Sequence, residues 1–102
     1  MDKQQIKQRL REAVEQAPHR QTIRSVALFG SCIHGTARRD SDIDVLVDFA
    51  PEATIGFFEL FDIQHHFESC LGRAVDLVTP QGISRFFRDR VLAEAEYVYQ
   101  GR

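Results

Sequence analysis

The stretch from Ser25 to Phe49, SVALFGSCIHGTARRDSDIDVLVDF, decides the fold predicted for this chain. It opens with a short apolar run that stops at Gly30, and it closes with a run rich in β-branched residues. Short apolar runs of this kind, bounded by turn residues, are typical of buried strands. We therefore predict strands over 25–29 and 43–49, joined by a polar segment that contains a short helical turn.

The flanking residues predict a small α/β domain. Apolar residues at helical spacing predict a helix over about the first seventeen residues, a second from Thr54 to about Cys70 that Gly72 closes, and a last helix from about Ile83 onward. The apolar run 74–79 predicts a third strand. The expected architecture is a single α+β domain over residues 1–102, with a small mixed sheet flanked by helices.

Composition excludes several classes of protein. The 102 residues carry a formal net charge of −2, with 43% hydrophobic and 27% charged residues, so attraction of the whole surface to nucleic acid is not expected. No apolar run approaches the length of a membrane span, and the polar N-terminus does not resemble a signal peptide. We expect a cytoplasmic protein in which Cys32 and Cys70 are reduced thiols.

Gly30 and Ser31 form the first part of a candidate site. A glycine at the end of a buried strand lets the backbone turn sharply and approach a ligand closely. If Ser31 opens a short helix, its hydroxyl and the nearby backbone N–H groups become donors suited to phosphate oxygens. The sequence therefore predicts phosphate binding at this turn.

Asp42 and Asp44 form the second part, ten residues beyond Ser31. Residues two apart in a strand project from the same face, so the two carboxylates are expected side by side. Two like charges in this position are unfavourable unless a cation lies between them. Oxygen-only ligands favour Mg²⁺ or Mn²⁺ over zinc. A divalent metal site is the prediction.

Asp76 interrupts the apolar strand 74–79. A carboxylate inside an apolar strand needs a partner if it is buried. If this strand lies beside 43–49, Asp76 joins the first pair as a metal ligand or general base. A sheet edge open to water is the alternative explanation. We favour the functional role, because the other two carboxylates already need a shared cation.

Two other groups of side chains receive structural interpretations. Asp48 shares a face with Asp42 and Asp44 but is interpreted as a solvated charge. Most of the phenylalanines in the two later helices are expected in the core, with a few left as an exposed patch that would dock a partner; they are Phe57, Phe58, Phe61, Phe67, Phe86 and Phe87.

At this point the motif resembles a known family. Gly-Ser, ten residues and Asp-x-Asp, in GSCIHGTARRDSDIDVLVDF, resembles the nucleotidyltransferase superfamily related to DNA polymerase β. The small size, the wording from Ala37 to Asp44 and the C-terminal VLAEAEYVY are similar to its minimal members, the MntA-type antitoxins encoded beside HEPN-domain toxins. The resemblance covers nearly the whole chain and implies the polymerase β-like nucleotidyltransferase fold.

The resemblance also implies a reaction. Gly30 and Ser31 would hold the triphosphate of ATP, and Asp42, Asp44 and Asp76 would be the catalytic carboxylates that bind Mg²⁺. The family transfers AMP from ATP to a tyrosine hydroxyl of the partner toxin and thereby silences its ribonuclease activity. Many relatives carry arginine where this chain has His34, and Arg38 and Arg39 are expected to supply the missing positive charge, with Arg38 as the residue expected to bind the nucleotide.

Two other functions remain open from the sequence. A non-catalytic antitoxin would neutralise the HEPN toxin by stoichiometric binding through an exposed aromatic surface. A transferase acting on a small molecule is less favoured, because so short a chain has no room for a second domain that holds the substrate.

Overall fold

A four-stranded sheet forms the centre of the structure, a computed structural model that describes residues 2–30 and 42–101. The strands lie in the order β3-β2-β1-β4. β1 (Ile23–Phe29) runs antiparallel to both β2 (Ile43–Phe49) and β4 (Glu96–Gln100), whereas β3 (Val75–Val78) runs parallel to β2. The predicted mixed sheet is confirmed, with β3 and β4 as its two edges.

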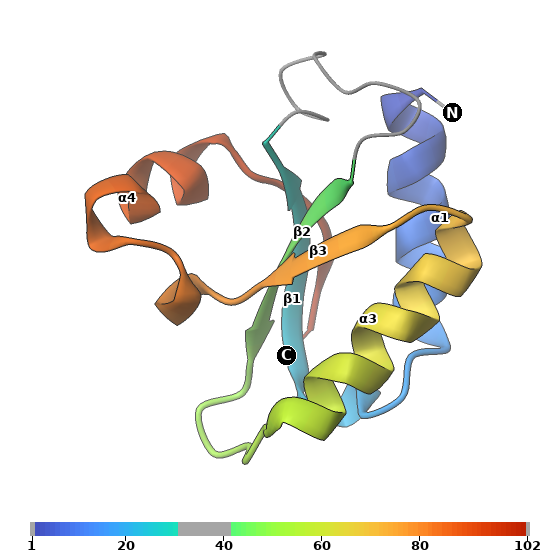
Figure 1. The fold of residues 1–102 in the computed structure, drawn as a ribbon, viewed down its shortest axis with the longest axis horizontal. Helices are drawn as coiled ribbons and strands as arrows, with labels where there is room; N and C mark the ends of the chain where they lie inside the picture. The colour runs from blue at the N-terminus through green and yellow to red at the C-terminus, as the bar shows by residue number, and fades with distance from the viewer. Residues whose placement is uncertain (1, 31–41, 102) are drawn as a thin grey trace.

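Two helices cover one face of the sheet. Figure 1 shows α1 (Lys3–Glu15) and α3 (Phe57–Leu71) together on that face, and α4 (Arg85–Glu94) on the opposite side. Single 3-10 turns, η1 (Arg20–Thr22) and η2 (Pro80–Gly82), follow α1 and β3. None of the helices within 2–30 and 42–101 is long and apolar enough to cross a membrane.

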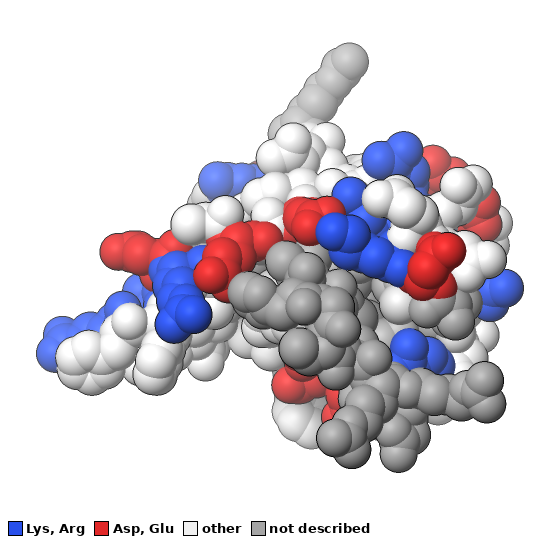
Figure 2. Space-filling model, turned by 90° about the horizontal axis from the view of Figure 1, so that it is seen from above, with Lys and Arg blue, Asp and Glu red and all other residues white. Residues whose placement is uncertain are grey.

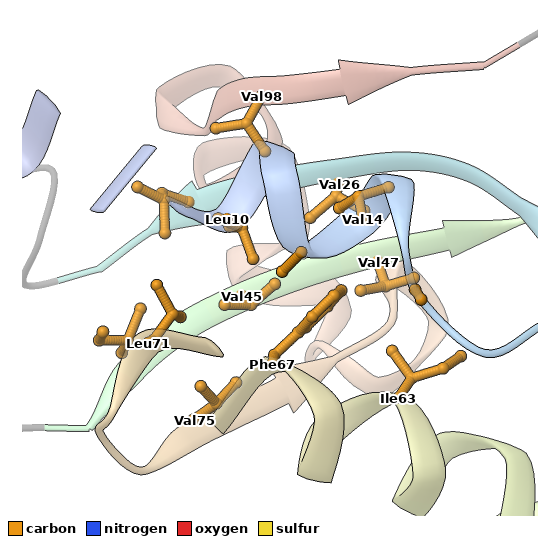
Figure 3. Close-up of a cluster of buried hydrophobic side chains, with 14 of the residues drawn as sticks. Leu10, Val14, Val26, Val45, Val47, Ile63, Phe67, Leu71, Val75 and Val98 are labelled. Carbon is orange, nitrogen blue, oxygen red and sulfur yellow. The ribbon is translucent and has the colours of Figure 1, made fainter. Parts of the chain in front are cut away.

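The hydrophobic core lies between the sheet and the pair α1 and α3. Figure 3 shows side chains of both helices meeting alternate residues of the strands, with Phe67 at the centre. Phe67 and Leu10 are completely buried. Burial of a phenylalanine or leucine side chain stabilises the fold by about 2 kcal/mol each. Because this packing occupies one face of each strand, the opposite face is the one left for functional side chains.

Capping interactions at the helix ends explain where α1 and α3 begin and where α3 ends. The Asp2 side chain accepts from the Gln5 N–H at 2.9 Å and begins α1. α3 begins after Gly56 and not at Thr54, because the Glu59 side chain accepts from the Gly56 N–H at 2.9 Å. Gly72 closes α3 with φ +68°, the left-handed conformation that the sequence predicted for it.

The C-terminal helix is shorter than expected, and a fourth strand replaces its second half. The sequence predicted one helix from about Ile83 to Val98, but α4 ends at Glu94 and β4 follows. The run 96–100 contains Tyr97, Val98 and Tyr99, which favour strands, and it completes the sheet by pairing with β1. Val98 is buried in β4 and would also be buried on the inner face of a helix. Apolar residues at helical spacing therefore did not distinguish a helix from a strand here.

The expectation that most phenylalanines of α3 and α4 lie in the core is wrong. Only Phe67 of the six is buried; the exposed ones are Phe57, Phe58, Phe61, Phe86 and Phe87. The core is filled by smaller side chains, and no residue of α4 is buried. Most of these rings are therefore exposed, in two groups on helices that lie on opposite sides of the sheet (Figure 1).

Glu96 ties the start of β4 to α1. Its two carboxylate oxygens accept from Lys3 Nζ at 3.0 Å and Lys7 Nζ at 3.2 Å. These hydrogen bonds, from Lys3 first and then Lys7, hold the pKa of Glu96 below its ordinary value. The folded state therefore binds the proton less readily than the unfolded state, and the pair stabilises the fold at neutral pH.

Glu96→Gln is expected to lower the free energy of unfolding at pH 7 by about 0.5–1 kcal/mol, since the ion pairs are partly exposed. The difference from the original chain should shrink as the pH falls through the pKa of Glu96 in the folded state, because the carboxylate is then neutral in both states. Urea unfolding across the acid range measures it. Glu52→Gln, in the exposed turn after β2, is the control; equal effects of the two changes would contradict the account.

Candidate active site

The site is built on the alternation of side chains along β2. Ile43, Val45 and Val47 face α1 and α3 and are completely buried. Asp44 and Asp48 alternate with them and therefore project from the other face, the side on which α4 lies (Figure 1). One face of the strand holds the core, and the other presents carboxylates.

Asp76 lies directly beside Asp44. The parallel register pairs Ile43 with Val75 and Asp44 with Asp76. Neighbouring strands are about 4.8 Å apart, and residues opposite one another project from the same face. The predicted juxtaposition of these two aspartates is thus confirmed. Asp76 is exposed on an edge strand, however, so the argument that a buried carboxylate needs a partner does not apply to it.

Hydrogen bonds at the start of β2 and β3 hold this register. The Ile43 N–H donates to the Ala74 carbonyl at 2.9 Å, and the Val75 N–H donates to the Glu68 carboxylate at 2.9 Å. Asp42 is exposed and comes immediately before β2. Across 2–30 and 42–101, no three side chains of His, Cys, Asp or Glu are gathered as a metal-binding group; the register itself fixes the pair Asp44 and Asp76.

Gly30 brings the backbone against Asp44. Its φ of +72° lies in the left-handed region, which residues with a Cβ rarely adopt. A Cβ built on Gly30 would collide with the Asp44 carboxylate and lie 3.1 Å from its Cγ. Phe29, the residue before, pairs with Asp44 across the strands. The turn after β1 therefore passes so close to the carboxylate that a side chain at position 30 would displace it. The sequence predicted a sharp turn at this glycine, but it did not predict the contact with Asp44.

The remaining predicted residues divide into two groups. Ser31, His34, Arg38 and Arg39 lie outside the described residues. Asp48 was interpreted as a solvated charge and not a ligand; it is half-buried, and its carboxylate lies 3.7 Å from Arg24 Nε.

A groove beside Gly30 was not foreseen from the sequence. It has a volume of about 290 Å³ and lies between the end of β1 and α4, lined by Phe29, Gly30, Phe87, Arg90, Val91 and Glu94. The sequence analysis expected most of the phenylalanines of α3 and α4, Phe87 among them, in the core. The groove is identified by an exposed aromatic side chain next to the glycine turn. That exposure depends on the tertiary structure, so the sequence alone did not reveal it.

Charges of both signs surround the site. Figure 2 views the end of the molecule where β1 finishes and β2 begins, and basic and acidic side chains alternate over its visible part. A strongly basic surface of the kind that binds nucleic acid by its phosphates is not seen on the described part of this face.

The donor set fits a hard divalent cation. Asp42, Asp44 and Asp76 offer only carboxylate oxygens, the ligands that Mg²⁺ prefers. The structure brings Asp44 and Asp76 together on one face, but among the residues it describes it does not gather Asp42 with them into the predicted group of three. The glycine turn beside Asp44 leaves space on the backbone side of the carboxylate that any side chain at position 30 would fill.

The family described as polymerase beta nucleotidyltransferase matches residues 8–101 of this chain. The chain belongs to this family. The resemblance inferred from the Gly-Ser and Asp-x-Asp motif is therefore confirmed, as is the nucleotidyltransferase fold.

Individual relatives agree with this family assignment. The protein adenylyltransferase MntA of Thermococcus cleftensis is 36% identical over 76 residues, which cover 74% of this chain and 75% of the relative. A solved minimal nucleotidyltransferase is 36% identical, with a TM-score of 0.76 over 94% of this chain and 95% of its own. An MNT antitoxin in complex with the tri-AMPylated HEPN toxin of Shewanella oneidensis shares the fold, with a TM-score of 0.68 at 18% identity over 97% of this chain and 73% of its own.

Gly30→Ala is expected to lower nucleotide transfer by about a hundredfold, because the new Cβ displaces the Asp44 carboxylate from its position. Both Gly30 and Gly72 have positive φ, so replacing either by alanine should cost about 1–2 kcal/mol of stability.

Gly72→Ala is the matched control, since nothing lies within 4 Å of a Cβ built there. Thermal unfolding and a transfer assay on both variants separate backbone strain from the collision. Equal loss of transfer in the two variants would contradict the proposed closeness of the turn and the carboxylate.

Proposed function

We propose that this chain is an antitoxin that transfers AMP from ATP to a tyrosine hydroxyl of a HEPN-domain toxin and so neutralises it in the cytoplasm. The observation that carries the proposal is the pair Asp44 and Asp76 on adjacent strands, with the Gly30 turn against Asp44. The relatives support the choice of substrates, because one is named a protein adenylyltransferase and another is bound to an AMPylated toxin.

Asp42, Asp44 and Asp76 are the residues that would hold Mg²⁺. When bound, the ion neutralises charge on the phosphates and on the departing pyrophosphate. Without a cation, two carboxylates on adjacent strands repel each other. The arrangement is therefore suited to a reaction whose substrate brings both a cation and several phosphate oxygens.

The chain's own groups position the triphosphate and deprotonate the acceptor hydroxyl. The Gly30–Ser31 turn binds the triphosphate, with Arg38 adding positive charge. Asp76 accepts the proton of the acceptor hydroxyl, whose oxygen forms the new bond to the α-phosphorus. The bond from the α-phosphorus to the oxygen bridging to the β-phosphate breaks, and pyrophosphate leaves with the electron pair. Positioning supplies most of the acceleration in such a transfer.

The place of Asp76 in the sheet favours an acceptor presented by a protein. β3 is an edge strand and Asp76 is exposed on it, so a side chain of another protein can reach the carboxylate without entering a deep pocket. A long side chain that ends in a hydroxyl, such as tyrosine, suits this approach. A small acceptor would instead need enclosing walls to hold it.

The exposed phenylalanines favour a second candidate function, neutralisation of the toxin by binding alone. Three such rings lie on α3 and two on α4, on opposite sides of the sheet (Figure 1), and their exposed fractions reach 81% for Phe58 and Phe86. Exposed apolar patches commonly mark surfaces that bind other proteins. Under this alternative the aspartates would be dispensable.

The double change Asp42→Asn and Asp44→Asn tests the catalytic proposal. Loss of the ligands should reduce transfer of label from ATP to the toxin roughly a thousandfold or more, because charge neutralisation by a bound cation contributes several kcal/mol. Label incorporation and the residual ribonuclease activity of the toxin are measured together, with Mg²⁺ present.

Asp48→Asn is the matched control, since Asp48 lies on the same face of β2 but pairs with Arg24. The control should transfer label as the original chain does. If the double variant transfers no label yet still silences the toxin, binding alone explains the function. Undiminished transfer by the double variant would show that the proposed mechanism is wrong.

A further inference from the structure

We propose that the groove between β1 and α4 holds the base of the nucleotide, with Phe87 as its stacking surface. The inference rests on the proposed function and extends it, because the sequence offers no motif for recognition of the base. It concerns only described residues: the groove is lined by Gly30 at one side and by the side chains of α4 at the other.

The lining has the character of a small-ligand site. Phe29 and Val91 contribute apolar surface, while Arg90 and Glu94 contribute a cation and a carboxylate whose atoms lie 3.5 Å apart. The volume of about 290 Å³ lies just below the range of pockets that bind small molecules, about 300–1,000 Å³, which suits a ligand as small as one base. A mainly apolar cleft with a few polar groups is the usual setting for a heterocyclic base.

Phe87 has the exposure that stacking requires. Its side chain is 59% exposed and lines the groove. α4 contains no buried residue, and the core does not account for an aromatic ring there. Exposed aromatic rings stack on bases through their flat faces, with little dependence on which base is present.

The start of α4 is fixed, which holds Phe87 in place. Arg88 donates from Nε to the Pro80 carbonyl at 2.9 Å and from Nη2 to the Ile83 carbonyl at 3.1 Å. The Ser84 carbonyl accepts from the Phe87 N–H at 2.9 Å. A stacking surface on an anchored helix costs less ordering entropy on binding than one on a free loop.

The position of the groove assigns it to the nucleotide and not to the acceptor. Three features lie side by side across the sheet: the groove at β1, Asp44 on the neighbouring strand β2, and Asp76 on the edge strand β3. In-line displacement places the attacking hydroxyl and the departing pyrophosphate on opposite sides of the α-phosphorus. With the hydroxyl at Asp76 and the triphosphate at Gly30, the groove adjoins the nucleotide.

Phe87→Ala should weaken binding of ATP by about tenfold in the presence of Mg²⁺, because one aromatic surface under the base is lost. Binding of inorganic triphosphate should not change, since it has no base. Phe86→Ala is the matched control: Phe86 is the neighbouring residue, is 81% exposed, and carries Arg85 over its ring at 5.4 Å instead of lining the groove. Calorimetric titration of each variant with ATP and with triphosphate measures both affinities.

The outcomes separate this inference from the proposed function. If Phe87→Ala and Phe86→Ala bind ATP equally well, or if Phe87→Ala loses ATP and triphosphate to the same degree, the base does not stack on Phe87, and transfer to the toxin still stands on its own test. If Phe87→Ala binds ATP normally but needs more toxin for half-maximal transfer, the groove belongs to the acceptor and the inference is overturned. Retention of ATP affinity in Phe87→Tyr supports stacking over a general effect on α4.

Discussion

The alternation of side chains along β2 is the constraint on which the rest of the structure depends. Three of its residues are completely buried against α1 and α3, so the intervening aspartates must face the other side. Shifting the register by one residue would bury Asp44 in the core, at a large cost in free energy. The core therefore specifies which face of β2 presents Asp44, the carboxylate on which the proposed function depends.

The sequence predicted the strands at the centre of the fold because strands depend on local patterns. The runs ending at Gly30 and beginning at Ile43 are strands, and the expected proximity of Asp76 to Asp44 is confirmed by the register. The sharp turn predicted at Gly30 is present, with a positive φ, whereas its closeness to Asp44 was not predicted. The ligand roles of the three aspartates remain predictions, and Ser31 and Arg38 lie outside the described residues.

The C-terminal third was predicted less well, for a physical reason. Val98 is apolar at helical spacing, yet it lies in β4, because pairing with β1 satisfies the backbone of that edge. Exposure of Phe86 and Phe87 could not be read from spacing either, since it depends on α4 lying apart from the core layer (Figure 1). Both departures concern tertiary placement, and the second of them created the groove beside Gly30.

The central claim is that Asp44 and its neighbours bind a divalent cation together with a nucleoside triphosphate. A crystal of the protein grown with Mn²⁺ and a non-hydrolysable ATP analogue tests it most directly, because Mn²⁺ is located by its anomalous scattering. The account predicts an anomalous peak about 2.1 Å from carboxylate oxygens of Asp42 and Asp44, also contacting phosphate oxygens of the nucleotide. A bound nucleotide with its cation away from these carboxylates would contradict the account.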